Sequence, residues 1–501
     1  MEVTMTADTP GVSTATAAVP YFDARETHTA MVVFAGDRAY KVKKPVLTDF
    51  VDFRTAAQRE RACRREVELN SRLSPDSYLG VAELTDPTGG PAEPIVVMRR
   101  YRDEDRLASM VNRGENVQGA LDRVAEVLAD FHRHALRGES IDAQGEAGTV
   151  GKRWRDNLWE LHQYAGTIPG VTEESVDRIE RLATEYISGR AHLFAHRIEE
   201  GCVVDGHGDL LADDIFVVDG EPALLDCMEF DDQLRYVDRI DDAAFLAMDL
   251  EFLGRKDLGD YFMERYIAHS GDESTPSLWH FYIAYRAVVR AKVECVRVTQ
   301  GASAAAADAV RHLSLATEHL QDGAVRLALV GGNPGTGKST VARALAEQVG
   351  AHVISTDDVR RELLESGVIS GDPGVLDSGL YSPDNVATVY EIVLRRARVC
   401  LDHGRSVILD GTWRHPHWRA EARRIAAETH SQPVEIRCAA GIEMTADRIV
   451  TRPAGNSDAT PEIAAALAAR PSGWDQAFRI DTSQPLASSA AQALEVWRKA
   501  I

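Results

Sequence analysis

"GGNPGTGKST", residues 331–340, decides the fold of the C-terminal part of this 501-residue chain. It matches the pattern G-x-x-x-x-G-K-[ST] from Gly332 to Ser339. The apolar run RLALV comes directly before it, and the helical stretch VARALAEQV comes directly after it. Glycines let the backbone wrap round an oxyanion, while the loop amides and the helix N-terminus donate hydrogen bonds to it. This strand–loop–helix context predicts a phosphate-binding loop.

The same loop predicts ATP and Mg²⁺ as ligands. Lys338 would reach the β- and γ-phosphate oxygens, and the Ser339 hydroxyl would ligate Mg²⁺. We expect the whole loop and the start of its helix to contact the nucleotide through Gly332, Asn333, Pro334, Gly335, Thr336, Gly337, Lys338, Ser339 and Thr340.

Two acidic residues downstream narrow the reaction. "VISTDDVRREL" places Asp357 at the end of a second strand, where an acid can accept the proton of a substrate hydroxyl. "SVILDGTW" places Asp410 at the end of another strand, suited to Mg²⁺ or its water shell. Both could instead be solvated strand ends.

Arg448 and Arg452 stand four residues apart in an expected helix, so they share one side of it. There they could neutralise charge on a phosphoryl group in transfer. The alternative is a basic stripe on the surface.

The hydrophobic pattern after residue 324 alternates between strands and helices, which predicts a parallel α/β sheet. We place a domain boundary near this residue. The expected strands are 326–330, 352–355, 406–409, 434–438 and 478–480, with helices after Lys338 and around 387–401 and 418–427.

A second motif lies in "HGDLLADDIFVVDGEPALLDCMEFDD", residues 207–232, which holds nine carboxylates. Two short strands, 215–218 and 223–225, flank an Asp219–Gly220 turn. Carboxylates this dense repel one another unless a cation lies among them or water surrounds them. The pattern therefore indicates either a metal site or a solvated surface.

The remaining pattern predicts strands first and helices later. A hairpin at 31–46, a helix near 55–73 and a strand at 94–101 precede helices at 121–134 and from Thr172. This order is typical of an α+β fold with a small β-rich lobe and a larger helical lobe.

The segment "HGDLLADD" and the hairpin after it resemble the catalytic loop of the aminoglycoside phosphotransferase group of the protein-kinase-like fold. The resemblance implies that Asp209 orients or deprotonates an acceptor hydroxyl, and that Asp226 holds Mg²⁺ on ATP. Asp214 stands where the family usually has Asn, and it would be a further metal ligand.

The same resemblance implies a lysine–glutamate pair upstream that positions the α- and β-phosphates. Alternation along "AYKVKKPV" puts Lys41 and Lys43 on one face of a strand, and Lys44 on the other. We choose Lys41, with Glu66 in "CRREVELN" as its partner. The segment "VVMRRY" would then contact adenine.

The C-terminal part, about 325–501, resembles the small P-loop kinases related to zeta toxins, gluconate kinases and adenylylate-type kinases. The segments that carry the resemblance are GGNPGTGKST, S-T-D-D-x-R-R, V-I-L-D-G-T and R-x-x-x-R-x-x-x-x-x-S-D-A-T. It implies ATP–Mg²⁺, a lid that carries Arg448 and Arg452, and transfer to a small hydroxyl compound.

Composition limits the partners. Asp plus Glu exceed Lys plus Arg by 78 to 56, so a net charge of −22 argues against nucleic acid or an anionic membrane. No apolar stretch approaches the ~18 residues of a membrane span. The six cysteines are scattered, which favours a reducing, cytoplasmic compartment. Small polar residues predict a disordered tail over residues 1–19.

Together these patterns predict a two-lobed kinase-like domain at 20–323 and a P-loop kinase domain at 324–501. The expected activity is ATP-dependent phosphorylation of a small hydroxylated molecule such as a sugar or amino sugar. The alternative is an ATP-binding regulatory or stress protein with slow hydrolysis and no metabolite acceptor. The sequence holds no recognisable code for the acceptor, for activity in the first domain, for coupling between the two sites or for the oligomeric state.

Overall fold

The computed structural model describes residues 21–27, 29–47, 51–85, 89, 92–373, 376–451, 460–470 and 473–500. The predicted tail, 1–19, lies outside them. The chain divides into two compact units, Met1–Arg133 with His207–Leu234, and His134–Gly206 with Arg235–Ile501.

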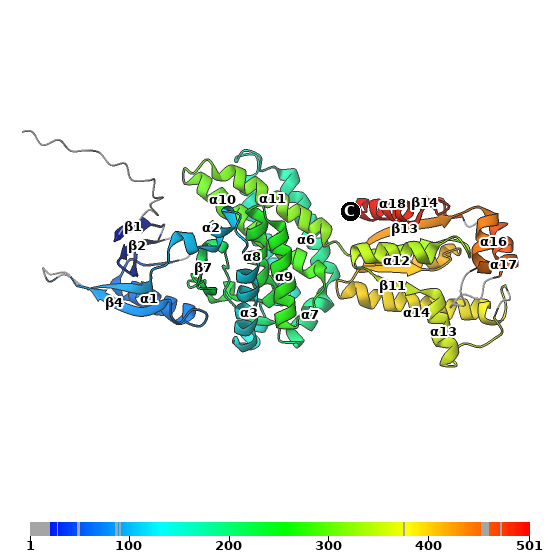
Figure 1. Ribbon diagram of the computed structural model, residues 1–501, viewed down its shortest axis with the longest axis horizontal. Helices are drawn as coiled ribbons and strands as arrows, with labels where there is room; N and C mark the ends of the chain where they lie inside the picture. The colour runs from blue at the N-terminus through cyan, green and yellow to red at the C-terminus, as the bar shows by residue number, and fades with distance from the viewer. Residues whose placement is uncertain are drawn as a thin grey trace, which may run out of the picture. The chain divides into compact units, whose positions relative to one another are not determined.

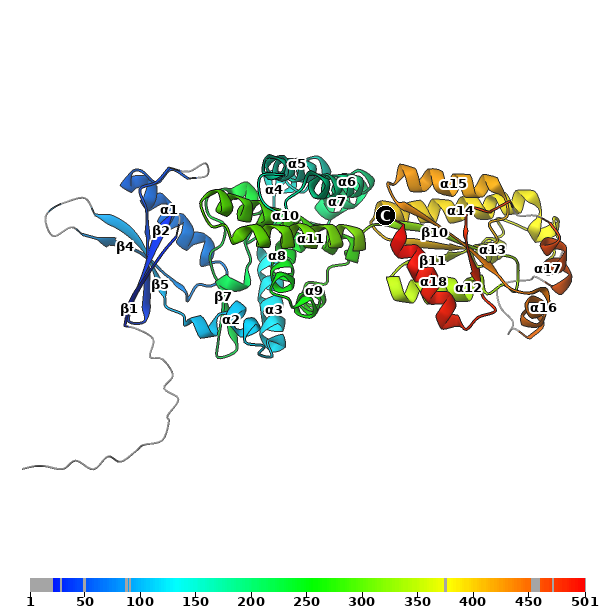
Figure 2. The same ribbon diagram turned by 90° about the horizontal axis from the view of Figure 1, so that it is seen from above.

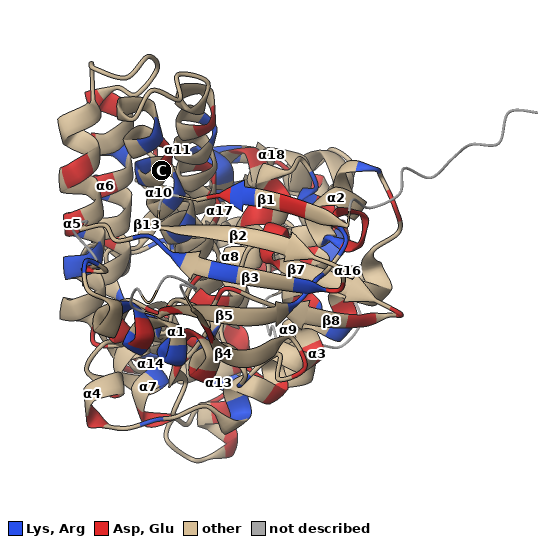
Figure 3. Ribbon diagram, turned by 90° about the vertical axis from the view of Figure 1, so that its left-hand side faces the viewer, with Lys and Arg blue, Asp and Glu red and all other residues tan. Residues whose placement is uncertain are grey.

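The first unit contains an antiparallel five-stranded sheet in the order β1-β2-β3-β5-β4, and Figure 3 shows these strands side by side. The predicted hairpin is β2 and β3, joined at Gly36, whose φ of 62° suits glycine. The edge strands β1 and β4 were not predicted, because their largely exposed residues give little apolar alternation. The strands are β1 Phe22–Glu26, β2 Ala30–Ala35, β3 Arg38–Lys43, β4 Tyr78–Leu84 and β5 Glu93–Arg99.

One helix, α1 (Ala56–Asn70), packs on β4 and β5. Its start is fixed by a capping box, in which the Thr55 hydroxyl accepts from the Gln58 amide and the Gln58 side chain accepts from the Thr55 amide. The helix then buries Cys63 and Glu66 towards the sheet. Helices α2 (Leu107–Asn112) and α3 (Gln118–His134) follow.

The acidic segment forms the predicted hairpin, β7 (Ile215–Val218) and β8 (Glu221–Leu224). Its turn places Asp219 at φ 53° and Gly220 at φ 85°, the left-handed pair that a tight two-residue turn requires. The hairpin contributes Phe216 to the same small core as Cys63.

The second unit begins with helices and two short strands, seen in green and cyan in Figure 1. Arg197 lies buried between Asp238 and Asp272, which compensate its charge. The elements are α4 Glu139–Asp142, α5 Ala147–Tyr164, α6 Glu173–Gly189, α7 Ala191–Glu199, β6 Val203–Asp205, β9 Tyr236–Asp238, α8 Arg239–Phe252, α9 Lys256–Ser270, α10 Pro276–Thr299 and α11 Ala305–Asp322.

The C-terminal part of this unit is a parallel sheet in the order β11-β12-β10-β13-β14, as the alternating pattern predicts. Helices α12 and α18 cover one face, and α14 and α15 cover the other (Figure 2). The elements are β10 Arg326–Gly331, α12 Lys338–Val349, β11 His352–Ser355, α13 Thr356–Glu365, α14 Pro383–Asp402, β12 Val407–Asp410, α15 Pro416–Glu428, β13 Gln432–Ala439, α16 Ile442–Thr451, α17 Pro461–Ala468, β14 Phe478–Asp481 and α18 Leu486–Lys499.

The central strand β10 ends where the phosphate-binding loop begins, between its neighbours β12 and β13. Parallel strands end at one edge of a sheet, so the loops after β10, β11 and β12 meet there. One detail differs from the prediction: Asp357 lies in the first turn of α13, two residues beyond the end of β11. No helix among the described residues is long and apolar enough to cross a membrane.

Truncation of Ile408 tests the core of the parallel sheet. This residue of β12 is fully buried. Ile408→Ala removes buried methyl groups and leaves a cavity, so we expect the free energy of unfolding of this sheet to fall by about 2–5 kcal/mol. Urea unfolding followed by circular dichroism measures it. Ile408→Val is the matched control, with an expected loss of about 0.5–1.5 kcal/mol. Equal losses in both variants would contradict this packing.

Candidate nucleotide and acceptor sites

Two lysines on one face of β3 share a single buried glutamate in the first unit. Lys41 Nζ lies 2.8 Å from Glu66 Oε1, and Lys43 Nζ lies 2.8 Å from Glu66 Oε2. Burial alone would raise the pKa of Glu66, but the two ammonium groups lower it to about 2. The structure therefore brings the expected Lys41–Glu66 pair together, and it adds Lys43.

The same ammonium groups reach the segment after the hairpin. Lys41 Nζ lies 2.9 Å from Asp226 Oδ1, and Lys43 Nζ lies 2.5 Å from Glu229 Oε1. Burial and the nearby Glu66 raise the pKa of Glu229 to about 8. The result is a line of alternating acidic and basic side chains, Asp226–Lys41–Glu66–Lys43–Glu229, which we call the lysine–carboxylate cluster. Sequence reasoning missed Lys43 and Glu229, although strand alternation had placed Lys43 on the face of Lys41.

A buried histidine joins the catalytic-loop segment to the segment of Asp226. The His207 ring donates from Nε2 to the Leu225 carbonyl (3.1 Å), so its Nδ1 is free to accept from the Asp209 amide (3.3 Å). Cys227 is held in turn through its amide by Asn70 Oδ1 (2.8 Å). Asp226, which lies between Leu225 and Cys227, adopts φ 62°. His207 thus fixes the backbones of Asp209 and Asp226 relative to each other.

The carboxylates of this loop repel one another. Burial, followed by the charges of Asp226, Asp209 and Asp213, raises the pKa of Asp214 well above its usual value. A divalent cation would relieve this repulsion, and carboxylate oxygens are the ligands that Mg²⁺ prefers. The residues present at Asp214 and Asp226 therefore fit a Mg²⁺ ion.

Some of these groups line a cleft of about 530 Å³. Lys41, Asp214 and Asp226 line it, whereas Asp209 does not. Its remaining wall mixes charged side chains with apolar and aromatic ones, among which Tyr101 stacks on Phe216 at 5.0 Å between ring centroids. The segment expected to contact adenine contributes Met98, Arg99, Arg100 and Tyr101 to this cleft.

The phosphate-binding loop of the second unit is wrapped too tightly for side chains at its glycines. Gly332 has φ 149°, and a Cβ there would lie 2.5 Å from Thr336 Oγ1. Gly335 has φ 79°, and a Cβ there would lie 2.5 Å from the Thr445 carbonyl oxygen. Gly337, at φ 79°, is the N-cap of α12 and turns the chain into the helix. The glycines at these positions therefore allow the backbone to form the tight loop that an oxyanion site needs.

Asp410 ends β12 next to Lys338 and Ser339. It is buried, and its Oδ1 has no hydrogen-bond partner within the described part of the chain. Burial raises the pKa of Asp410, while Lys338 and Ser339 oppose the shift. A hydroxyl beside a buried carboxylate with an unused oxygen fits Mg²⁺.

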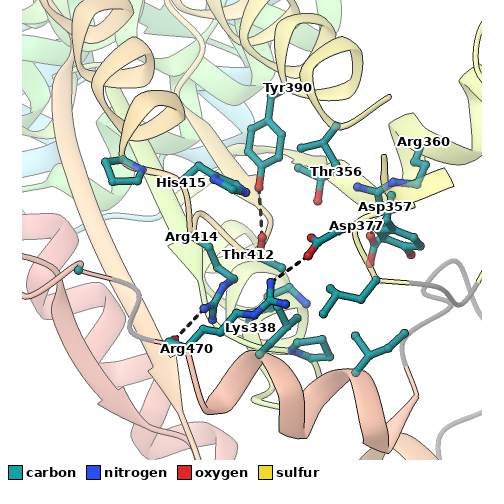
Figure 4. A pocket seen from close by; sticks show the side chains of 18 residues that line it. Lys338, Thr356, Asp357, Arg360, Asp377, Tyr390, Thr412, Arg414, His415 and Arg470 are labelled. Carbon is teal, nitrogen blue, oxygen red and sulfur yellow. Dashed lines mark hydrogen bonds and ion pairs between the residues drawn. The ribbon is translucent and has the colours of Figure 1, made fainter. Parts of the chain in front are cut away.

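A pocket of about 510 Å³ adjoins this loop (Figure 4). Lys338 and Asp357 both line it. Asp357 lies in the first turn of α13, where its amide donates to Ser355 Oγ, and its carboxylate pairs with Arg360 Nη1 at 2.7 Å. Asp357 therefore faces the same space as the lysine expected to bind the γ-phosphate.

The other predicted residues take varied positions. Arg448 donates to the Thr482 carbonyl (2.8 Å), and Thr482 Oγ1 donates to the Thr336 carbonyl (2.6 Å), so Arg448 supports the loop from behind. Thr340 is exposed on α12. Pro334 lines the pocket, and Asn333 Oδ1 accepts from Arg414. Arg452 lies outside the described residues.

Comparisons with known proteins identify a matching domain family and close relatives of the chain. Residues 327–470 match a family model described as an AAA domain. Uncharacterized proteins of Mycobacterium tuberculosis (Rv2004c of strain H37Rv) and Mycobacterium bovis (Mb2027c) are each 67% identical to the chain over 482 residues, which cover 96% of both sequences.

Solved structures with local likeness include three kinases. A putative kinase from Chloroflexus aurantiacus is 20% identical and covers 34% of this chain and 98% of its own, with a TM-score of 0.29. A gluconokinase from Sinorhizobium meliloti is 18% identical and covers 34% and 91%, with a TM-score of 0.26. A choline/ethanolamine kinase family protein from Mesorhizobium loti is 16% identical and covers 61% and 94%, with a TM-score of 0.37.

The chain thus combines an α+β fold with a C-terminal parallel α/β domain that carries a P-loop and matches the AAA domain family model. The chain belongs to the same family as the mycobacterial proteins Rv2004c and Mb2027c.

Replacement of Glu229 by Gln tests the lysine–carboxylate cluster through the pH dependence of stability. Its folded pKa of about 8 exceeds the ordinary value of 4.5, so between these pH values the folded chain holds a proton that the unfolded chain has released. The contribution of Glu229 to the free energy of unfolding should therefore fall as the pH rises from about 4.5 to 8. In Glu229→Gln this fall should be smaller.

Chemical unfolding at a series of pH values measures the slope. Glu221→Gln, an exposed change on the hairpin that precedes Glu229, is the control and should keep the wild-type slope. An unchanged slope in Glu229→Gln would contradict the proposed protonation.

Proposed function

We propose that the chain transfers the γ-phosphoryl group of ATP to the hydroxyl group of a small molecule, and that this occurs in the pocket beside the P-loop. The observation that carries the proposal is that Lys338 and Asp357 line one pocket, with Ser339 and Asp410 behind the lysine. A phosphate-binding cation and a carboxylate that can take a proton are the two groups such a transfer needs.

In the proposed reaction the acceptor oxygen attacks the γ-phosphorus. A bond forms between that oxygen and phosphorus, the bond from the γ-phosphorus to the β–γ bridging oxygen breaks, and ADP leaves. The hydroxyl proton passes to the Asp357 carboxylate, which Arg360 holds in place. Lys338 stabilises the negative charge on the phosphate oxygens. Mg²⁺ held by Ser339 and Asp410 would neutralise β- and γ-phosphate charge.

For the first unit we propose nucleotide binding in the cleft beside the lysine–carboxylate cluster. Lys41 would leave Asp226 for the α- and β-phosphates, and Asp226 with Asp214 would hold Mg²⁺. Asp214 in place of the usual Asn adds a negative charge to this site. That departure favours a second candidate role, in which this site binds ATP to regulate the chain. We further propose that the protein acts in the cytoplasm.

The number of bound nucleotides tests the two-site proposal. We expect about two molecules of a non-hydrolysable ATP analogue per chain with excess Mg²⁺, because each fold carries one set of phosphate ligands. Isothermal titration calorimetry on the full chain measures this stoichiometry. Lys338→Ala and Lys41→Ala should each reduce it to about one. Lys499→Ala, at an exposed position on α18, is the control. Uptake of no nucleotide would refute the proposed function.

Acceptor-stimulated ADP release locates the chemistry. With a panel of hydroxylated compounds, we expect Lys338→Ala to abolish the stimulation, because it removes the cation beside the γ-phosphate. Asp209→Asn should keep the stimulation if the first unit is regulatory. A coupled ADP assay measures both variants. Loss in Asp209→Asn with retention in Lys338→Ala would move the reaction to the first unit, against our proposal.

A further inference from the structure

The pocket beside the P-loop holds more positive than negative charge, although the chain as a whole has a net charge of −22. Its cations are Lys338, Arg360, Arg414 and Arg470, and its carboxylates are Asp357 and Asp377. Figure 4 shows Lys338, Arg414 and Arg470 grouped together in this pocket.

Ion pairs account for two of these cations. Arg360 pairs with Asp357 at 2.7 Å, and Arg470 Nη1 pairs with Asp377 Oδ2 at 2.9 Å. Lys338 is assigned to the nucleotide phosphates by the proposed function. This leaves Arg414 as the cation whose charge the pocket does not compensate.

Arg414 has neutral hydrogen-bond partners. Its Nη1 donates to Asn333 Oδ1 (2.8 Å), and its Nη2 donates to the Arg470 carbonyl (2.7 Å). No carboxylate of the described residues forms an ion pair with it. Burial and the neighbouring guanidinium of Arg470 lower the pKa of Arg414, while Asp377 opposes this shift. An oxyanion in the pocket would remove this electrostatic cost.

Arg360 gives a second, independent indication. It is only 7% exposed, and its Nε has no hydrogen-bond partner within the described ranges. Its guanidinium stacks on Tyr381 with 4.5 Å to the ring centroid. A buried guanidinium donor without an acceptor is costly unless a ligand supplies one.

The remainder of the lining is mainly apolar or aromatic, with Leu376, Tyr381, Val386, Tyr390, Ile463 and Leu467. Thr356, Thr412 and His415 add polar groups, and the apolar and aromatic side chains suit a hydrocarbon or aromatic body. The cations in turn repel an amino sugar or any other cationic acceptor.

We propose that the acceptor of this pocket is a hydroxy compound that carries an oxyanion, either a carboxylate or a phosphate-type group, on an apolar or aromatic body, and that Arg414 binds this oxyanion. The proposal rests on the proposed function, which supplies the hydroxyl and its transfer to phosphate. It replaces the expected sugar or amino sugar by an anionic class.

A matched set of probes on one scaffold separates charge from shape. 4-(Hydroxymethyl)benzoate carries a carboxylate, its methyl ester is neutral, and 4-(hydroxymethyl)benzylamine is cationic. 4-(Hydroxymethyl)phenylphosphonate distinguishes a phosphate-type anion from a carboxylate. Calorimetry on the full chain saturated with ADP and Mg²⁺ measures the affinity of each. We expect at least one anion to bind at least about tenfold more tightly than the ester, a difference in binding free energy of about 1.4 kcal/mol. The amine should bind more weakly than the ester.

Arg414→Gln should reduce the preference for the anion to about twofold or less while ADP–Mg²⁺ affinity stays the same. Arg414→Lys keeps the charge and should retain part of the preference. The control is Arg424→Gln on α15, where an exposed arginine pairs with Glu421 and Glu428. It should bind every probe as the wild type does.

Three outcomes would overturn the proposal. They are equal binding of acid and ester, no binding of either anion or of inorganic phosphate, and an Arg414→Gln variant that loses ADP affinity but keeps the anion preference. The last result would assign Arg414 to the nucleotide. If the anions bind selectively and yet none stimulates ADP release or yields a phosphorylated product, the proposed function fails while the anion site stands.

Discussion

A charge removed from water must find a partner, and this requirement governs both sites of the molecule. In the first unit Glu66 lies fully buried, and it is tolerable there only because Lys41 and Lys43 reach it from neighbouring positions of β3. Those lysines in turn contact Asp226 and Glu229, so the strand, the helix α1 and the segment after the hairpin are joined by one line of acidic and basic side chains. In the second unit the same requirement is left partly unmet, because Arg414 faces only neutral acceptors. The cluster around Glu66 therefore joins parts of the first unit, whereas Arg414 is the group to which we assign an anionic ligand in the second.

Much of this arrangement could be predicted from sequence because its signals are local. The loop glycines, Lys338 and Ser339 lie within a few residues of one another, and their backbone requirements leave few other folds. Strand alternation likewise placed Lys41 and Lys43 on one face before any partner was known. The spacing of His207, Asp209 and Asp226 reflects one short hairpin, whose length is fixed by its two-residue turn at Asp219–Gly220.

The remainder could not be predicted because its partners are distant in sequence. Glu229 meets Lys43 across 186 residues, and nothing in the sequence around Glu229 distinguishes it from the other acids of that segment. Arg414 and Arg470 are 56 residues apart and become neighbours only when the strands assemble. Asp357 shows a smaller difference of the same origin, since the Ser355 cap, rather than the apolar pattern, sets where α13 begins. The exposed strand β1 gave no pattern because its partner sheet, and not its own apolar residues, makes it a strand.

The ion pair between Asp377 and Arg470 makes the pocket sensitive to ionic strength. Both side chains are more than half exposed, so dissolved salt weakens their attraction, whose strength in such a setting is about 0–1 kcal/mol. Added electrolyte would loosen this link between two pocket-lining segments, and it would also screen the long-range attraction between the basic pocket and an incoming anion. The attraction of an anion to the pocket should therefore weaken as the ionic strength rises.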